Sequence, residues 1–291
     1  MAGSGITFNP DKYSKNQNGF HIFLIILSIF MGSPIVFIIN HAFKPFTELF
    51  AFPPKFFVRN PTIENFVRLI AFSEESGIPI SRYIFNSAVT TVAVVILSII
   101  IASLAAFALS KLEFKGKAAL NKINQYSLMF VPVAVAIPRF LVLINMGIYN
   151  TYFAHVIPLL AMPVGLFLVK QFMDTNVPTE LLEAAKIDGA GNWRIYWSIA
   201  LPLVMPALVT VGILAFQISW GNTEGSNLYV DQEALRTLPF YMSTVISQQG
   251  NIVVTAGVGA AAQLIMFVPN IIIFIFMQNK VMASMATSGI K

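Results

Sequence analysis

Residues 178–194 hold the most informative spacing of chemical groups in the sequence. They predict a short surface helix that Gly189 ends, because glycine readily adopts the left-handed conformation found after helix termini. Ala184 and Ala185 leave a thin helical face that another protein could approach, and Glu183 offers one charge to a partner cation. The chemistry that this pattern favours is protein docking. An amphipathic helix held at the membrane surface by nearby aromatic residues is the alternative.

Acidic residues are absent from the apolar segments of the sequence. All thirteen Asp and Glu residues lie outside the apolar segments, whereas proton-coupled carriers and intramembrane enzymes usually place acids or histidines at membrane depth. The three histidines, His21, His41 and His155, are too dispersed for a helical metal site. A phosphate-binding Gly-x-x-x-x-Gly-Lys loop is missing as well.

The composition predicts an all-α membrane protein. Hydrophobic residues make up 56% of the chain and charged residues 11%, against about 25% charged residues in soluble domains. Six apolar segments approach the length of about 20 residues that a spanning helix needs. They are Phe20–Asn40, Ile84–Leu109, Ile123–Met146, Phe153–Lys170, Ile199–Ser219 and Ile252–Met277. The hydrocarbon core offers no hydrogen-bond partners to backbone N–H and C=O groups, so these spans must be helical.

The basic residues predict the orientation of these spans. Lys111, Lys115, Lys117 and Lys122 crowd the loop between the second and third segments, which places that loop in the cytoplasm. Scattered in short loops, the basic residues indicate membrane orientation and not a nucleic-acid surface. We expect a cytoplasmic N-terminal tail (1–19), a six-helix domain (20–280) with an outer loop (41–83) and a cytoplasmic loop (171–198), and a cytoplasmic C-terminal tail (281–291).

Polar and aromatic side chains near the span ends are candidates for a substrate pathway. Aromatic faces stack on sugar rings, and amides or hydroxyls bind sugar hydroxyl groups. The candidates are Arg139, Asn145, Tyr149, Gln217, Trp220 and Asn222. Each could instead be a polar contact between helices or part of the interfacial aromatic belt.

Arg139 has two interpretations of its own, because a charge within a span is costly unless it faces a cavity or finds a partner. It could bind an acidic saccharide. It could also snorkel to the membrane surface or pair with a partner subunit.

Several motifs resemble the permease subunits of ATP-binding-cassette (ABC) importers. Glu183-Ala184-Ala185, Asp188-Gly189-Ala190 and Leu201-Pro202 resemble the EAA loop of the carbohydrate-uptake branch. Asn86-Ser87, Ala105–Leu109, Phe114–Lys117 and Trp220–Asn222 are similar to the same family, and the ending Met285–Lys291 resembles the tail-bearing permease of maltose importers. Arg139 and the segment after Trp220 depart from the family pattern.

The resemblance implies a type I importer permease of six transmembrane helices with a coupling helix over Pro178–Asp188. In this family two permeases, expected here to be a heterodimer, form one pathway, and a binding protein outside the cytoplasm delivers the sugar. Two ATPase subunits bind ATP and Mg²⁺, so this chain itself would be no enzyme and would bind no cofactor. Glu183, Ala184, Ala185, Asp188, Gly189 and Ala190 would contact an ATPase.

Two other classes of protein remain as alternatives. A secondary sugar carrier would need ligands for a coupling ion in broken helices, which the missing buried acids disfavour. A membrane-embedded enzyme would need an acid, a base and a nucleophile together, and the sequence shows no such group.

Overall fold

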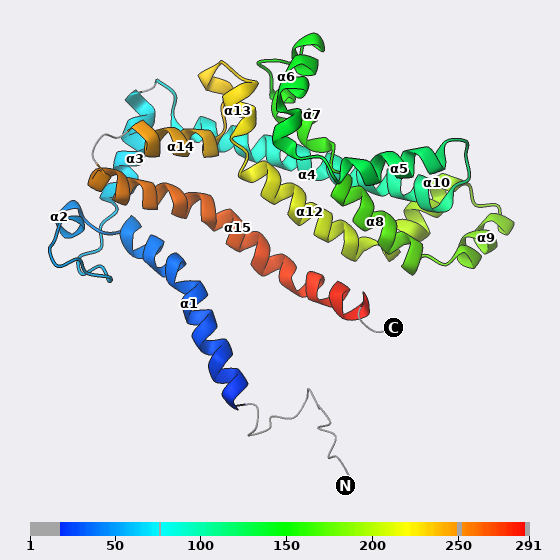
Figure 1. The fold of residues 1–291 in the computed structure, drawn as a ribbon, viewed down its shortest axis with the longest axis horizontal. Coiled ribbons are helices and arrows are strands. Elements are labelled where there is room, and N and C mark those ends of the chain that lie inside the picture. Colours follow the sequence, from blue (N-terminus) through cyan, green and yellow to red (C-terminus); the bar gives the residue numbers. More distant parts are fainter. Residues whose placement is uncertain (1–17, 76, 249–251, 289–291) are drawn as a thin grey trace, which may run out of the picture.

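Helices form every regular element in the part of the chain that the computed structural model describes, residues 18–75, 77–248 and 252–288 (Figure 1). Three helices are long and apolar enough to cross a membrane: α1 (Asn18–Ala42), α4 (Ile80–Lys111) and α15 (Ile252–Ser288). Two bent helix pairs raise the number of candidate spans to as many as five. The predicted all-α membrane fold is confirmed.

Prolines bend the predicted fourth and fifth spans. Helix α7 (Tyr152–Leu160) meets α8 (Pro163–Asn176) at an angle of 44°, and the helices on either side of Val204 meet at 78°. The bends lie directly before Pro163 and between Pro202 and Pro206. Proline disfavours the helical conformation in the residue before it and cannot donate a backbone hydrogen bond.

The prediction of one continuous helix over Ile123–Met146 is wrong. The structure divides this segment into α5 (Lys117–Ser127), the 3-10 helix η2 (Pro132–Val135) and α6 (Ala136–Asn145). Pro132 and Pro138 lie near the middle of the segment, where each removes a backbone donor. Apolar length alone therefore overestimated the helical continuity of this span.

Shorter helices connect the long ones. They are α2 (Phe46–Leu49), α3 (Glu64–Glu75), α9 (Thr179–Ile187), α10 (Asn192–Ile195), the π-helix η3 (Tyr196–Ala200), α11 (Leu201–Leu203), α12 (Met205–Trp220), α13 (Glu224–Leu228), the 3-10 helix η4 (Glu233–Leu235) and α14 (Leu238–Gln248). Helices α2 and α3 occupy the predicted outer loop. At the opposite end of α4 lie α9 and α10 (Figure 1).

Helix α4 forms the centre of the bundle and packs mainly against α12 and α8. The largest apolar cluster joins these helices and includes Ala106, Val169, Tyr196 and Val211, all of which are buried. This cluster reaches to α9 through Leu182, so the short surface helix is anchored in the same core as the spans.

Small residues near the start of α15 allow close helix packing. A side chain at Gly257 would meet Asn65 Oδ1 at 2.6 Å, and Ala260 and Ala261 pack with Ala42 at the end of α1. Small residues let helix backbones approach closely within a membrane.

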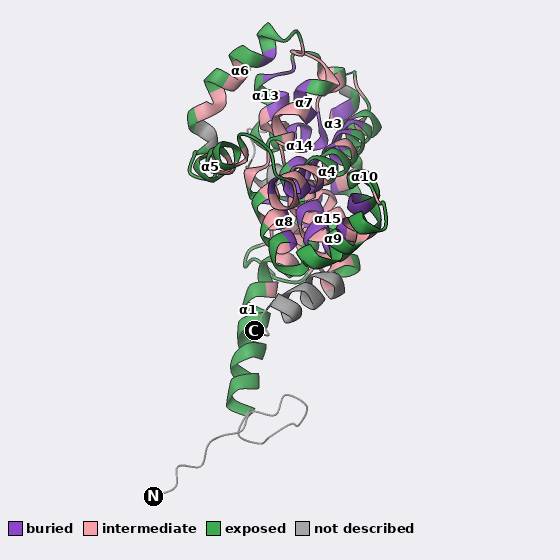
Figure 2. Cartoon of the chain, turned by 90° about the vertical axis from the view of Figure 1, so that its right-hand side faces the viewer, coloured by how far each residue is buried: buried purple, intermediate pink, exposed green. Residues whose placement is uncertain are grey.

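Helix α1 projects away from the bundle, and nearly all of its surface is exposed (Figure 2). Its 18-residue apolar window is 0% buried within the chain. The predicted N-terminal tail lies almost wholly outside the described residues. Helix α15 continues through most of the predicted C-terminal tail, to Ser288.

Candidate functional site: a surface helix and a polar cleft

The predicted surface helix is α9, which begins one residue after Pro178. Its end has the expected geometry: Gly189 has a φ of +82°, and the N–H of Ala190 donates to the carbonyl of Ala185 at 2.9 Å. This six-to-one bond closes the helix end as in a Schellman motif. Helix α10 begins only a few residues later, so α9 and α10 form a tight helix–turn–helix.

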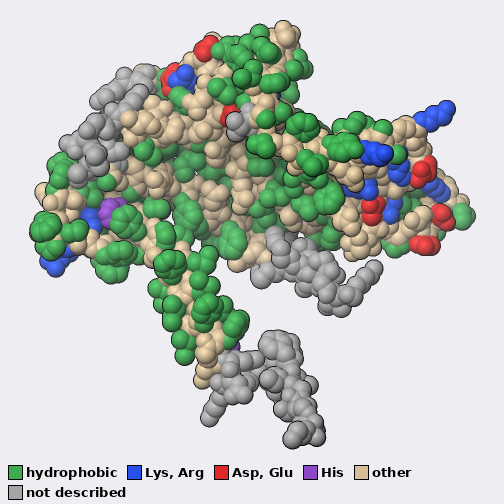
Figure 3. Space-filling view, viewed as in Figure 1, with side chains coloured by type: hydrophobic (Ala, Val, Ile, Leu, Met, Phe, Trp, Pro, Cys, Tyr) green, Lys and Arg blue, Asp and Glu red, His purple; other side chains and the backbone are tan. Residues whose placement is uncertain are grey.

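One side of α9 packs on the bundle and the other is exposed. Leu182 is buried in the core, and Ala185 and Ala190 pack against the same cluster. Glu183, Ala184, Asp188 and Gly189 are exposed, and Ile187 is 86% exposed. Of the two alanines predicted to form a thin docking face, Ala184 is exposed and Ala185 is half-buried, because residues next to each other point to different sides of a helix. Charged side chains gather at this end of the molecule (Figure 3).

Hydrogen bonds connect the helix–turn–helix to α4. The Tyr196 hydroxyl lies 2.7 Å from Ser103 Oγ, and Lys111 Nζ donates to the Val177 carbonyl at 2.6 Å. On α8, Asp174 accepts hydrogen bonds from Lys170 and from Ser110 of α4. The segments directly before and after the helix–turn–helix are therefore both hydrogen-bonded to α4.

The chain after α10 bends sharply before it enters α12. A π-helix at Tyr196–Ala200 precedes α11, and the bend follows at Val204. Pro202 and Pro206 lie in the first turns of α11 and α12, where a proline is tolerated. The bend at Val204 therefore lies between these two prolines.

The proposed pathway residues fall into separate groups. Gln217 and Trp220 line a cleft of about 470 Å³ between α1, α12, α14 and α15. This cleft, named here the amide cleft, also contains Ser243, Gln263 and Asn270, and no charged side chain is among its described lining residues. Gln217 and Gln263 are exposed, and neither amide has a hydrogen-bond partner among the described residues.

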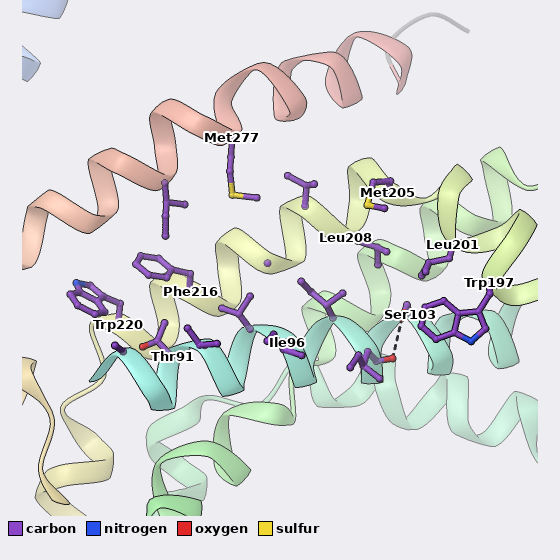
Figure 4. Close-up of a pocket in the computed structure, with 18 of the residues that line it drawn as sticks. Thr91, Ile96, Ser103, Trp197, Leu201, Met205, Leu208, Phe216, Trp220 and Met277 are labelled. Carbon is purple, nitrogen blue, oxygen red and sulfur yellow. Dashed lines mark hydrogen bonds between the residues drawn. The ribbon is translucent and has the colours of Figure 1, made fainter. Parts of the chain in front are cut away.

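Trp220 joins the amide cleft to a second cavity. This apolar cavity of about 590 Å³ lies between α4, α12 and α15, with Trp220 at one end and Trp197 at the other (Figure 4). The Trp220 ring stacks on Phe216 at 5.7 Å, and its Nε1–H donates to the Met266 carbonyl at 3.0 Å. The indole is therefore fixed where the polar and apolar spaces meet.

Arg139 pairs with an acid of its own chain. Its Nη1 lies 3.2 Å from Glu224 Oε1, and the same carboxylate oxygen accepts a hydrogen bond from the Tyr229 hydroxyl at 2.8 Å. Burial, together with the hydrogen bond to Glu224, raises the pKa of Tyr229 to about 12. Neither interpretation of Arg139 from the sequence included this pair, and its guanidinium is not a free cation.

The remaining candidates have structural contacts or lie apart. Tyr149 donates to Asp231 at 2.7 Å, which raises the pKa of the tyrosine. Asn222 Oδ1 accepts the N–H of Gly225 at 2.9 Å, and Asn145 is exposed at the end of α6. These residues are separate from the amide cleft.

Sequence reasoning missed Glu224, Asp231 and Gln263. Glu224 begins α13 and Asp231 follows it, both far in sequence from the residues that they contact, so nothing in the sequence marks them as partners of Arg139 and Tyr149. Gln263, in contrast, could have been found from the sequence. It shares a helical stripe with Met266, Phe267 and Asn270, which places two amides on one face of an apolar helix.

Comparison with known proteins identifies the family. Residues 14–281 match the family described as "Binding-protein-dependent transport system inner membrane component". A putative ABC transporter permease of Caldicellulosiruptor sp. is 32% identical over 95% of this chain and 98% of its own length. The probable permease YurM of Bacillus subtilis is 29% identical, with coverages of 96% and 90%.

Two further proteins extend the comparison. The arabinooligosaccharide permease AraQ of Halalkalibacterium halodurans is 28% identical over 92% of this chain and 93% of its own. The fold matches a chain in the crystal structure of a bacterial ABC transporter for the acidic polysaccharide alginate, with a TM-score of 0.79, 21% identity and coverages of 92% and 98%. The chain therefore belongs to the family of binding-protein-dependent transport inner membrane components: it is a permease subunit of an ABC importer, whose ATPase is a separate subunit.

Proposed function

We propose that this permease subunit imports an uncharged oligosaccharide and that α9 is its coupling helix. The observation that carries the proposal is the placement of α9: Leu182 anchors it in the core while Glu183 and Ala184 remain exposed. Among the relatives, AraQ is named for arabinooligosaccharides. The family membership removes the main support for a secondary carrier, because the importers of this family are driven by ATP.

In this proposal Glu183 faces a basic residue in a groove of an ATPase subunit, next to Ala184, Asp188 and Gly189. Closure of the ATPase pair moves α9, and the contacts of α4 with Tyr196 and Val177 transmit the movement to the spans. Residues 171–198 form the cytoplasmic loop, both chain ends are cytoplasmic, and residues 41–83 face outward.

The amide cleft would be the part of the pathway that contacts sugar. Gln217 and Gln263 present unpaired amides, Trp220 and Phe267 supply aromatic surface, and the described lining carries no charge. This chemistry fits hydroxyl groups and apolar sugar faces. Because Arg139 is paired with Glu224, it offers no free positive charge to an acidic sugar.

Reconstitution tests the function. The assembled transporter in nanodiscs should hydrolyse ATP faster when a binding protein loaded with a neutral oligosaccharide is added, and uptake in vesicles should require ATP. Uptake that persists without ATP would contradict the proposal, as would stimulation by acidic sugars alone.

Substitution tests the amide cleft. Gln217→Leu removes an amide at nearly constant size and should lower sugar uptake about tenfold, the effect of losing one hydrogen bond of about 1.4 kcal/mol. Gln125→Leu, at an exposed position of α5, is the matched control. Equal uptake by both variants at limiting sugar would remove Gln217 from the pathway.

A further inference from the structure

The segment that follows α2 exposes an unusual number of aromatic rings. Phe50, Phe52, Phe56 and Phe57 are all exposed, Phe52 to 97% and Phe57 to 67%. We name residues 50–60 the phenylalanine loop. Exposed apolar side chains gathered in one place usually mark an interaction surface.

Hydrogen bonds hold this loop in the conformation that exposes the rings. The two carboxylate oxygens of Glu48 accept the backbone N–H groups of Arg59 and Asn60, at 3.0 and 2.9 Å. Lys44 Nζ donates to the Lys55 carbonyl at 2.5 Å. The hydrogen bond from the Arg59 N–H also lowers the pKa of Glu48 below its usual value.

The loop lies beside the end of a membrane-spanning helix. The N–H of Val58 donates to Asn40 Oδ1 on α1 at 3.1 Å, and the Phe56 ring lies 6.1 Å from Phe37 of the same helix. Helix α1 ends at Ala42, and Figure 1 shows α2 and the loop next to that end. The loop therefore lies beside the C-terminal end of α1, a candidate membrane span.

The charges of the loop suit an anionic surface. Lys55 and Arg59 are exposed, and neither is within salt-bridge distance of a carboxylate among the described residues. The carboxylate of Glu48 is already occupied by backbone N–H groups. Figure 3 shows hydrophobic side chains with Lys or Arg at their edge around this end of the molecule.

We propose that the phenylalanine loop is a lipid anchor. Its rings insert into the membrane interface beside α1, and Lys55 and Arg59 bind the phosphates of anionic phospholipid headgroups. Aromatic and basic side chains together bind membrane interfaces by this combination of apolar burial and charge attraction. The anchor fixes the end of α1, the helix that the bundle itself leaves most exposed. A docked protein with an acidic surface is the competing occupant.

The chain contains no cysteine, so single-cysteine spin labels test the anchor directly. Labels at Phe52→Cys and Phe57→Cys are placed in the assembled transporter, in nanodiscs of phosphatidylcholine with or without phosphatidylglycerol. Collision with oxygen reports lipid contact, and collision with a water-soluble nickel complex reports water contact. Phe30→Cys, exposed on α1, is the lipid control, and Glu113→Cys, in an exposed turn, is the water control.

The proposal expects both loop labels to resemble Phe30→Cys, and more strongly when phosphatidylglycerol is present. Labels that resemble Glu113→Cys in both lipids overturn it. Labels that contact water until the binding protein is added assign the loop to that protein and also overturn it. Lys55→Gln with Arg59→Gln should abolish the response to phosphatidylglycerol, and an unchanged response overturns the headgroup contact. None of these outcomes depends on sugar transport, so they leave the proposed function to its own test.

Discussion

Glu183 and Arg139 are charged side chains with opposite surroundings. Arg139 is partly buried and its charge is compensated by Glu224, whereas Glu183 is exposed on α9 and forms no salt bridge among the described residues. An unpaired charge on a surface costs little in water and is available to a partner. The partner of Arg139 could not be predicted from the sequence, because 85 residues separate the two side chains. The left-handed conformation of Gly189 could be predicted, because it depends only on local backbone chemistry.

The Glu183→Ala variant should insert into the membrane normally, but ATP hydrolysis should no longer be coupled to sugar uptake. One charge-assisted hydrogen bond is worth about 1.5–3 kcal/mol, so uptake should fall by about 10- to 100-fold. ATP hydrolysis and sugar uptake are measured on the same proteoliposomes. Glu113→Ala, which removes an exposed acid from the turn after α4, is the control and should transport normally. Normal uptake by Glu183→Ala would contradict the assignment of Glu183 as a residue that contacts the ATPase.

The Arg139→Gln variant should keep its sugar preference. Removing the arginine leaves Glu224 with the Tyr229 hydroxyl, so we expect a loss of about 1 kcal/mol in stability, since the pair is partly solvated. The ratio of neutral to acidic sugar uptake should stay that of the parent. The melting temperature and both uptake rates are measured together, and a selective loss of acidic sugar uptake would restore Arg139 as a substrate-binding cation.

Among the elements, uninterrupted helices were predictable and broken ones were not. The apolar run Ile84–Leu109 lies inside α4, and Ile252–Met277 lies inside α15, because a long apolar segment without internal prolines, or with a single proline, can remain one helix. The run Ile123–Met146 instead contains two prolines near its middle, Pro132 and Pro138. Hydropathy measures transfer into lipid and does not report where backbone donors are missing. The amide cleft also escaped prediction, because it forms only where α1 meets α12, α14 and α15, which are about 180 residues or more further along the chain.

Gly189 and Gly191 allow a matched test of the turn between α9 and α10. Neither glycine has an atom within 4 Å of an added side chain, but only Gly189 has a positive φ. Gly189→Val should therefore strain the turn by at least about 1–2 kcal/mol and displace α9, whereas Gly191→Val should fit. Copurification with the ATPase and sugar-dependent ATP hydrolysis are compared for both variants. Equal activities would show that the backbone of this turn does not position α9.

On the scale of the whole molecule, the chain forms only part of a transport pathway. Apolar side chains on α1 and α6 remain exposed, and the apolar cavity is lined by α4, α12, α15 and the segment 196–201. The resemblance to ABC importers implies two ATPase subunits, and the described chain offers one helix–turn–helix of the α9–α10 kind. If α9 is the coupling helix, as proposed above, two permease subunits would give each ATPase one coupling helix.

We predict that the second permease is a different chain. Two differently tagged copies of this chain, expressed with the ATPase and a candidate second permease, should not copurify with each other, although each should copurify with that permease. A homodimer would bury the same surface patch of both copies against itself, and the two tags would then be recovered together. Expression without the second permease is the control: the exposed apolar surface of α6 should then lower the yield of folded chain in detergent. Recovery of both tags in one active complex would establish the homodimer instead and would place two copies of the amide cleft along one pathway.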